Sequence, residues 1–194
     1  ECLEGIKEAC EFLNYPVVSG NVSFYNGTNK KNIDPTPVIG GVGLINKLTI
    51  PLNHVLKKEK SPVLLIGKTF GHLEQSCFLK ENYSISSGSP PEINLLNEKN
   101  NGEIVLKLIQ ENLILSAHDV SNGGLLVALS EMTMSSNYGI RIQKPKKLTN
   151  NIEYFFGEDQ GRYILEIDVD KLSITEKILK DNNIFLMSAS GQSF

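Results

Sequence analysis

The first segment with residues suited to chemistry is the turn Ser19-Gly20-Asn21, which is followed closely by Ser23. Glycine allows a sharp bend after a strand, so that backbone N–H groups can face an anion. The amide oxygen of Asn21 suits Mg²⁺, and the hydroxyl of Ser23 suits a phosphate or another polar substrate. An ordinary turn explains the same residue types, so the motif alone leaves both interpretations open.

The second such segment is Ser116–Gly124, in which Asp119, Ser121 and two glycines precede an apolar stretch. Small polar residues at the start of a helix present free amides and the positive end of the helix dipole, where phosphate binds. Asp119 could hold a divalent cation that bridges the phosphates. N-capping by Asp119 or Ser121 is the alternative, but capping does not require two glycines, each of which costs about 1 kcal/mol of helix propensity. The glycine pair therefore favours a backbone that something approaches closely.

Two further features give weaker indications. Residues 155–162 (FFGEDQGR) place two acids and an amide between glycines, which suits a polar ligand or a cation, although a charged turn before a strand is the commoner explanation. His118 lies beside Asp119, but neighbours in an extended segment point to opposite sides, so we expect a structural histidine. Neither a P-loop nor a Rossmann glycine motif occurs, which excludes those nucleotide sites.

The elements that would position these segments alternate between helix and strand patterns. Apolar residues at helical spacing predict helices over residues 1–13, 103–112, 125–132 and 172–181. Short apolar runs predict strands over residues 16–18, 38–45, 62–66 and 184–187, with 62–66 as a central strand. Strict alternation over residues 162–170 predicts a half-buried strand, with Glu166 opposite its apolar face. We therefore expect the α/β or α+β class, with helices packed on a mixed sheet and a domain boundary within the charged residues 53–61.

Composition excludes several classes of protein. The chain has 194 residues, of which 40% are hydrophobic and 21% charged, a balance typical of globular proteins. A net charge of −3 argues against nucleic-acid binding, and no apolar run reaches the roughly 18–20 residues that span a bilayer. Three unevenly spaced cysteines fit a reducing compartment, so we expect a cytoplasmic location. Because the chain starts at Glu1, we also expect it to be a piece of something longer.

Four stretches, in this order, resemble the later half of the ATP-using subunit of the formylglycinamide ribonucleotide amidotransferases. They are PVVSGNVSFYN (16–26), PTPVIGGVGL (35–44), SAHDVSNGGLLVALSEM (116–132) and FGEDQGR (156–162). The resemblance implies two fused halves similar to aminoimidazole ribonucleotide synthetase, each with a sheet-forming N-terminal domain and an α/β C-terminal domain. Residues 1–52 would then be the tail of the second N-terminal domain, and residues 60–194 an incomplete second C-terminal domain.

The reaction implied by the resemblance is the ATP-dependent conversion of formylglycinamide ribonucleotide to its amidine in purine biosynthesis. Ammonia would come from a glutaminase subunit, with a small accessory subunit as a further partner. Matching positions imply that Gly20 contacts ATP, Asn21 ligates Mg²⁺ and Ser23 contacts the substrate. Asp119 and Ser121 match residues that hold Mg²⁺ and a nucleotide at an auxiliary site in long members. The family's catalytic residues lie in the first half, so we expect none here and no synthetase activity from this chain alone.

Two departures from the family pattern concern the auxiliary site. Asn122 stands where the family usually has aspartate, and residues 72–76 (HLEQS) are less glycine-rich than usual. Glu158-Asp159-Gln160 matches a substrate-binding pattern of the first half whose counterpart here can be structural. Other ATP-using members of the superfamily remain open: aminoimidazole ribonucleotide synthetase, selenophosphate synthetase and thiamine-phosphate kinase. A non-catalytic scaffold that supports the first half and docks the glutaminase also remains open.

Overall fold

The computed structural model describes residues 2–23, 25–34, 36–45, 52–143, 150–184 and 186–193. The chain divides into two compact units, Glu1–Ile50 and Pro51–Phe194. This division lies close to the boundary expected at residues 53–61, whereas the assignment of the two parts to particular synthetase domains stays a prediction. In the described residues, no helix is both long and apolar enough to cross a membrane.

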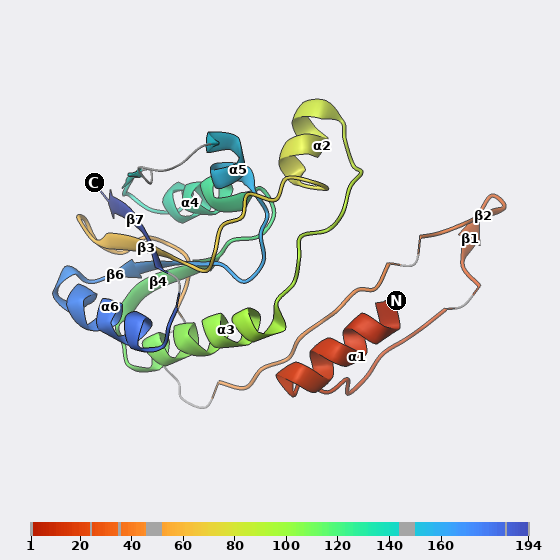
Figure 1. Ribbon diagram of the computed structural model, residues 1–194, viewed down its shortest axis with the longest axis horizontal. Helices are drawn as coiled ribbons and strands as arrows, with labels where there is room; N and C mark the ends of the chain where they lie inside the picture. Colours follow the sequence, from red (N-terminus) through yellow and green to blue (C-terminus); the bar gives the residue numbers. More distant parts are fainter. Residues whose placement is uncertain are drawn as a thin grey trace. The chain divides into compact units, whose positions relative to one another are not determined.

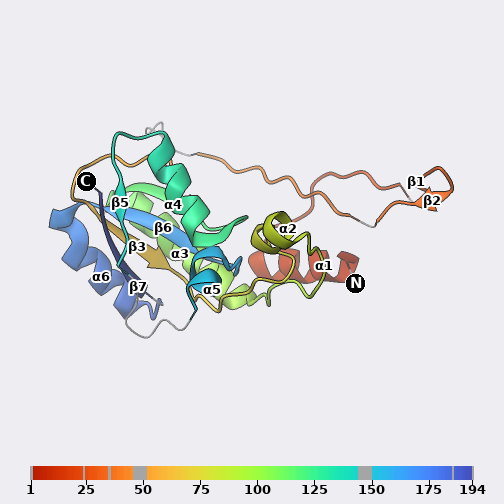
Figure 2. The ribbon, with the colours of Figure 1, turned by 90° about the horizontal axis from the view of Figure 1, so that it is seen from above.

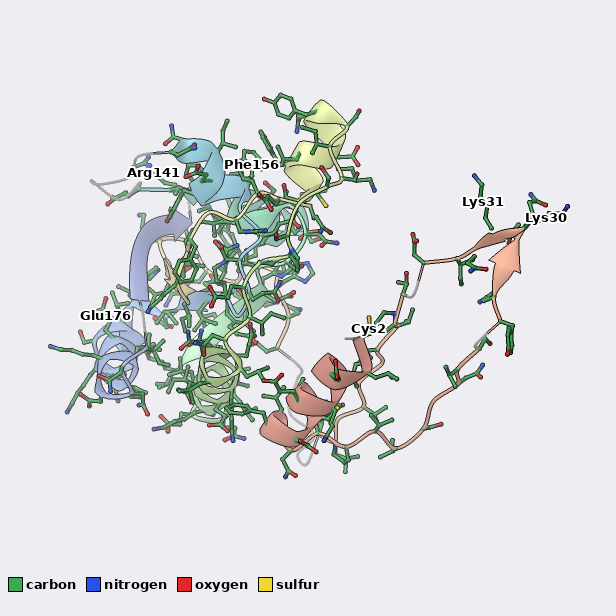
Figure 3. All side chains as sticks on the ribbon, turned by 45° about the vertical axis from the view of Figure 1, so that its right-hand side comes forward. Cys2, Lys30, Lys31, Arg141, Phe156 and Glu176 are labelled. Carbon is green, nitrogen blue, oxygen red and sulfur yellow. The ribbon has the colours of Figure 1, made fainter. Side chains whose placement is uncertain are left out.

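The first unit contains one helix and a short hairpin. Helix α1 spans Cys2–Leu13, as its apolar spacing predicts, and it ends where Asn14 adopts a positive φ of 53°. Strands β1 (Gly27–Thr28) and β2 (Lys31–Asn32) pair antiparallel, and the side chains of Lys30 and Lys31 project from the tip of this hairpin (Figure 3).

The strands predicted at residues 16–18 and 38–45 do not form, which corrects the expectation. Both segments lack regular structure, and Val18 and Val38 are 90% and 92% exposed. A strand needs neighbours that pair with its backbone and cover its apolar face. Among the described residues of this unit, the only strands are two residues long, and Val42 instead exchanges two hydrogen bonds with the Tyr15 hydroxyl at 2.9 and 3.2 Å.

The second unit is built on a five-stranded sheet with the order β4-β6-β3-β7-β5. The strands are β3 (Pro62–Ile66), β4 (Ile114–Asp119), β5 (Ile140–Arg141), β6 (Tyr163–Ile167) and β7 (Leu186–Ser193). The prediction that 62–66 is central is confirmed, because β3 lies between β6 and β7. The pairings of this sheet are antiparallel and not mixed. Hydrophobic patterning predicts a strand's burial but carries no information on its direction.

Two helical layers cover this sheet (Figure 1, Figure 2). On one face, α4 (Gly124–Met134) and α5 (Asn151–Phe156) pack against Val63, Leu65 and Ile164. On the other face, α3 (Leu95–Gln110) and α6 (Leu172–Asp181) pack against Leu64, Ile66, Leu165 and Ile167. The short elements α2 (Cys77–Tyr83) and η1 (Val169–Lys171) complete the unit. The expected class, helices stacked on a sheet, is thereby confirmed.

Strand β6 is buried on both faces, which corrects the prediction of a half-buried strand. Alternation places Tyr163, Leu165 and Ile167 on one face correctly. The opposite face is not open, because Glu166 on it is completely buried. Its carboxylate accepts hydrogen bonds at 2.7–3.1 Å from the N–H groups of Lys57 and Lys58 and from the hydroxyls of Ser61 and Ser116. A carboxylate can be buried when its oxygens are hydrogen-bonded in this way.

Candidate functional site

The candidate site is organised by residues 157–162, which lead from α5 into β6. The carboxylate of Asp159 is only 4% exposed and accepts hydrogen bonds from three consecutive backbone N–H groups, those of Phe70, Gly71 and His72, at 3.0, 2.9 and 3.2 Å. The loop after β3 is thus fixed to the start of β6. The carboxylate of Asp159 therefore binds the protein's own backbone.

Glu158 also accepts hydrogen bonds from backbone N–H groups, in this case at the starts of two helices. Its Oε1 atom accepts the N–H of Cys77 and the N–H of Gly123, both at 2.8 Å. Burial, and secondly the charge of Glu158, raise the pKa of the Cys77 thiol, which favours its protonated form. These contacts support the structural interpretation of the Glu158-Asp159-Gln160 pattern.

Arg162 completes this arrangement from inside the protein. Its guanidinium donates to the carbonyl oxygens of Gly157 and Asp159 and to the Thr69 hydroxyl, the last two at 3.2 and 3.3 Å. Burial lowers the pKa of Arg162, whereas the Asp159 carboxylate, 3.8 Å away, acts in the opposite direction. A guanidinium with this many partners is a fixed structural charge.

A cavity of about 390 Å³ opens beside these residues, and we call it the acidic pocket. Its walls carry five carboxylates and one buried guanidinium, from Glu74, Glu98, Asp119, Glu158, Asp159 and Arg162. Such a balance of charge repels an uncomplexed anion and attracts a cation or the metal complex of an anion.

Asp119 and Ser121 both line the acidic pocket, so the structure brings these two predicted site residues together. The Asp119 side chain is 64% exposed, and its Oδ1 lies 3.2 Å from Nδ1 of His118. The expectation that these two neighbours point apart is therefore wrong, because Asp119 is the last residue of β4 and its side chain is free to turn back. His118 also contacts Glu131 at 3.2 Å, which agrees with the structural role predicted for this histidine.

The two glycines at the start of α4, Gly123 at the N-cap and Gly124 as the first helical residue, serve packing inside the protein. Both have positive φ, 81° for Gly123 and 72° for Gly124. A Cβ atom on Gly123 would lie 2.5 Å from the Val127 side chain, and one on Gly124 would lie 2.7 Å from the backbone of Phe156. The close approach that the glycines indicate is therefore made by α4 and α5 themselves. The alternative interpretation, in which Asp119 or Ser121 is the N-cap of this helix, is also wrong. The N-cap is Gly123, which has no side chain with which to cap α4.

Three neighbouring residues of the acidic pocket carry oxygen atoms of the kind that binds a hard cation. Asp119, Ser121 and Asn122 offer carboxylate, hydroxyl and amide oxygens, the ligands that Mg²⁺ prefers. In the part of the chain that the structure describes, no three histidine, cysteine or acidic side chains are placed to hold a metal ion together.

The other three predicted site residues lie in the first unit. Gly20, Asn21 and Ser23 belong to an exposed segment without regular structure. Among the described residues, a Cβ on Gly20 would meet no atom within 4 Å apart from the neighbouring residues of the chain. The structure thus places Asp119 and Ser121 on one pocket of the second unit, whereas Gly20, Asn21 and Ser23 lie in the first unit and line no cavity that it describes.

Glu74 and Glu98 form a further wall of the acidic pocket, which the sequence does not predict. Glu74 accepts the N–H of Ser89, and His72 Nε2 lies 2.9 Å from the Ser89 carbonyl oxygen, which together fix the loop carrying Pro90 and Pro91 over the acidic pocket. Burial raises the pKa of Glu98. An acid in the first turn of a helix is ordinary, so no sequence signal distinguishes it.

Known proteins resemble the chain over most of its length. The subunit PurL of phosphoribosylformylglycinamidine synthase from Pelagibacter ubique (strain HTCC1062) is 52% identical over 184 residues, which is 95% of this chain and 25% of the relative. That of Rhodopseudomonas palustris (strain HaA2) is 45% identical over 171 residues, 88% of this chain and 23% of the relative. The chain thus spans about a quarter of the length of these curated relatives. The resemblance stated from the four motif stretches is confirmed.

Solved structures agree at the level of the fold. Thermotoga maritima PurL complexed with FGAR matches 74% of this chain and 25% of that chain, at 19% identity and a TM-score of 0.60. The same protein complexed with ATP matches 74% of this chain and 23% of that chain, at 17% identity and a TM-score of 0.55. The sequence family of the AIR synthase related protein, C-terminal domain, matches residues 61–187. This match covers both helical layers, the acidic pocket and the sheet except for most of β7, and the chain therefore belongs to that family.

Proposed function

We propose that this chain supplies the C-terminal part of the ATP-using subunit of a phosphoribosylformylglycinamidine synthase. The observation that carries the proposal is the 52% identity with the P. ubique subunit over 95% of this chain. The complete enzyme converts formylglycinamide ribonucleotide to its amidine with ATP and glutamine-derived ammonia. A glutaminase and a small accessory subunit are its partners, and the cytoplasm is its location.

In this proposal, the segment around Gly20 contributes to the nucleotide and substrate site. Gly20 lets the backbone approach ATP, Asn21 offers an oxygen ligand for Mg²⁺, and Ser23 donates its hydroxyl to the substrate. The exposure of the whole segment around Gly20 supports its access to a ligand. Mg²⁺ supplies charge compensation on the phosphates of the nucleotide.

Asp119 and Ser121 serve an auxiliary nucleotide site in the same proposal. The carboxylates around the acidic pocket disfavour an uncomplexed triphosphate, so the nucleotide binds there as its metal complex. Asp119 is suited to contact the metal because its side chain is largely exposed on the pocket rim.

One observation favours a second candidate, a scaffold half without a nucleotide of its own. Glu158 already accepts the Gly123 N–H at the start of α4, in the position where a phosphate would bind. A part of the subunit that fills this position with its own carboxylate can support the catalytic half through packing alone.

A chimaeric enzyme tests the proposal. The matching segment of the P. ubique subunit is replaced by this chain, and amidine formation is measured with formylglycinamide ribonucleotide, Mg·ATP and ammonium, which makes the glutaminase unnecessary. We expect activity within about tenfold of the parent subunit, a difference of roughly 1.4 kcal/mol in the barrier. A folded but inactive chimaera would contradict the proposal, as would amidine formation by this chain alone.

Matched substitutions in the chimaera separate the two candidates. Asn21→Ala should lower kcat/KM at least about tenfold, and Asn26→Ala, an exposed asparagine of the same unit, should not. Asp119→Asn should weaken nucleotide binding at the auxiliary site, whereas Asp181→Asn, exposed on α6, should leave it unchanged. Unchanged activity and unchanged nucleotide binding in both site variants would favour the scaffold.

A further inference from the structure

A second cavity, of about 470 Å³, lies in the same unit, and we call it the amide pocket. Four segments form its walls: the end of β3 with the loop after it, the start of α3, residues 159–160 and the turn after α6. Its volume is in the range of about 300–1,000 Å³ that is typical of small-molecule sites. The lining is dominated by amide side chains, namely Asn94, Asn97, Asn100, Asn101, Asn182, Asn183 and Gln160.

Several of these amides face solvent. Within residues 52–143 and 150–184, the side chains of Asn97, Asn100, Asn183 and Gln160 are exposed and make no hydrogen bond to the protein. This contrasts with Asp159 on the same wall, whose carboxylate accepts three backbone N–H groups. Each exposed amide offers both a donor and an acceptor, which suits a ligand that carries both as well.

The charges around the amide pocket disfavour a ligand that carries phosphate. Lys68 shares the wall with three carboxylates, those of Glu92, Glu98 and Asp159, and only the last is close to a second cation, Arg162 at 3.8 Å. A phosphate would be repelled by these acids, whereas a ligand without a phosphate would not.

An exposed aromatic ring adds a flat apolar surface to the wall. Phe70 lines the amide pocket and is 78% exposed, while its backbone N–H is fixed to Asp159 at 3.0 Å. A large apolar ring held at the rim of a polar cavity is suited to stacking on a planar heterocycle. Asparagine and glutamine amides pair with the donor and acceptor edge of such a heterocycle.

We propose that the amide pocket binds an uncharged nucleoside. The base stacks on Phe70, and the amides of Asn97, Asn100 and Gln160 hydrogen-bond to the edge of the base and to the ribose hydroxyls. The amide pocket shares Glu98, Asp159 and Gln160 with the acidic pocket, but Phe70, Asn97 and Asn100 line the amide pocket and not the acidic pocket. Binding of a nucleoside there does not depend on synthetase activity.

Titration of the complete 194-residue chain with adenosine tests the proposal. Heteronuclear NMR gives the affinity and the affected residues, and thermal unfolding shows that each variant is folded. Phe70→Ala should weaken binding about 5- to 150-fold, the range for loss of one base-stacking ring. Asn97→Ala should weaken it about two- to tenfold, as expected for one hydrogen bond.

Matched controls lie outside the amide pocket. Tyr83→Ala removes another exposed ring and Asn82→Ala another exposed amide, both on α2, and neither should change the affinity. Inorganic phosphate should not displace adenosine. The same titration on the chimaeric subunit gives a result even where the chain alone does not fold.

Two results would overturn the proposal. One is the absence of saturable adenosine binding at millimolar nucleoside by folded protein. The other is binding that Asp119→Asn weakens and Phe70→Ala leaves intact, because the ligand would then occupy the acidic pocket. Adenosine binding with the expected pattern supports the amide pocket even if the chimaera proves inactive, so the two proposals fail separately.

Discussion

The carboxylate of Glu158 connects the backbone of Cys77 to that of Gly123: one oxygen accepts both N–H groups, each at 2.8 Å. The first residue begins α2 and the second precedes α4. Exposed amides and the helix dipole at such positions are the features that a bound phosphate uses. At α4, the protein therefore places its own anion where the sequence predicts a phosphate.

Removing this carboxylate should destabilise the second unit. Glu158→Ala leaves two N–H groups without their acceptor and should lower the free energy of unfolding by about 1–3 kcal/mol. Glu158→Gln keeps an acceptor oxygen and should cost less. Urea unfolding at pH 7 measures both, with Glu176→Ala on the exposed side of α6 as the control, expected within about 0.5 kcal/mol of wild type. Equal stability of Glu158→Ala and wild type would show that this connection is unimportant.

The same substitution should create an anion site. In Glu158→Ala, the Gly123 N–H becomes available, so inorganic phosphate should raise the melting temperature of this variant more than that of wild type. Chloride at equal ionic strength is the control for screening. An identical phosphate effect on both proteins would mean that the start of α4 does not bind anions.

Glu166 is a second internal carboxylate with a larger expected effect. It is completely buried, and its donors are the N–H groups of Lys57 and Lys58 and the hydroxyls of Ser61 and Ser116. Glu166→Leu removes the acceptor that these donors share, although the Ser61 hydroxyl keeps the Lys58 carbonyl oxygen at 2.9 Å, and it should lower the free energy of unfolding by at least about 3 kcal/mol. Glu166→Gln should be intermediate, because it restores one acceptor and adds an unmatched donor group. Urea unfolding measures the loss, with Glu176→Leu as the control. A loss below about 1 kcal/mol for Glu166→Leu would be inconsistent with this role.

Local patterns are sufficient for many elements of the fold. Apolar spacing alone predicts α6 at residues 172–181 and β3 at residues 62–66, with the same bounds as in the structure. Features that depend on distant partners are not predictable in this way. The apolar segment 38–45 pairs with no strand among the described residues of its unit, and Glu166 accepts hydrogen bonds from four donor groups in two distant segments.

In the candidate site, too, local patterns predict some features, whereas others depend on distant partners. The segments 116–124 and 156–162 stand out in the sequence, and the structure brings both to the acidic pocket. What each residue contacts there depends on tertiary packing. Glycine at positions 123 and 124 indicates a close approach, but only the folded chain shows that Val127 and Phe156 make it.

Glu98 should give stability a distinctive pH dependence. Burial raises the pKa of this carboxyl above its ordinary value of 4.5, so the folded state binds a proton more readily than the unfolded state does. As the pH falls from 7 through the raised folded-state pKa towards 4.5, wild type should therefore gain stability relative to Glu98→Gln. Urea unfolding of both proteins across this range measures the difference, with Glu103→Gln, exposed on the same helix, as the control. A difference that is constant with pH would contradict this role of burial.

Two glycine substitutions should have opposite effects on stability. Gly124 has a φ of 72°, and a Cβ there would lie 2.7 Å from the carbonyl carbon of Phe156 and 2.8 Å from the carbonyl oxygen of Gly157. Gly124→Ala must push α4 and α5 apart and adopt a strained backbone, which should cost about 2–5 kcal/mol. Gly102 lies inside α3, where a Cβ would meet only the Tyr163 hydroxyl, at 3.8 Å.

Gly102→Ala should therefore stabilise the protein by about 0.5–1 kcal/mol, because alanine favours the helix and restricts the unfolded chain. Thermal and urea unfolding of the two variants, side by side, make the comparison. If Gly124→Ala were as stable as wild type while its affinity for Mg·ATP fell, the glycine would serve a ligand at the start of α4. The contact between α4 and α5 predicts the reverse: a large loss of stability whether or not nucleotide is present.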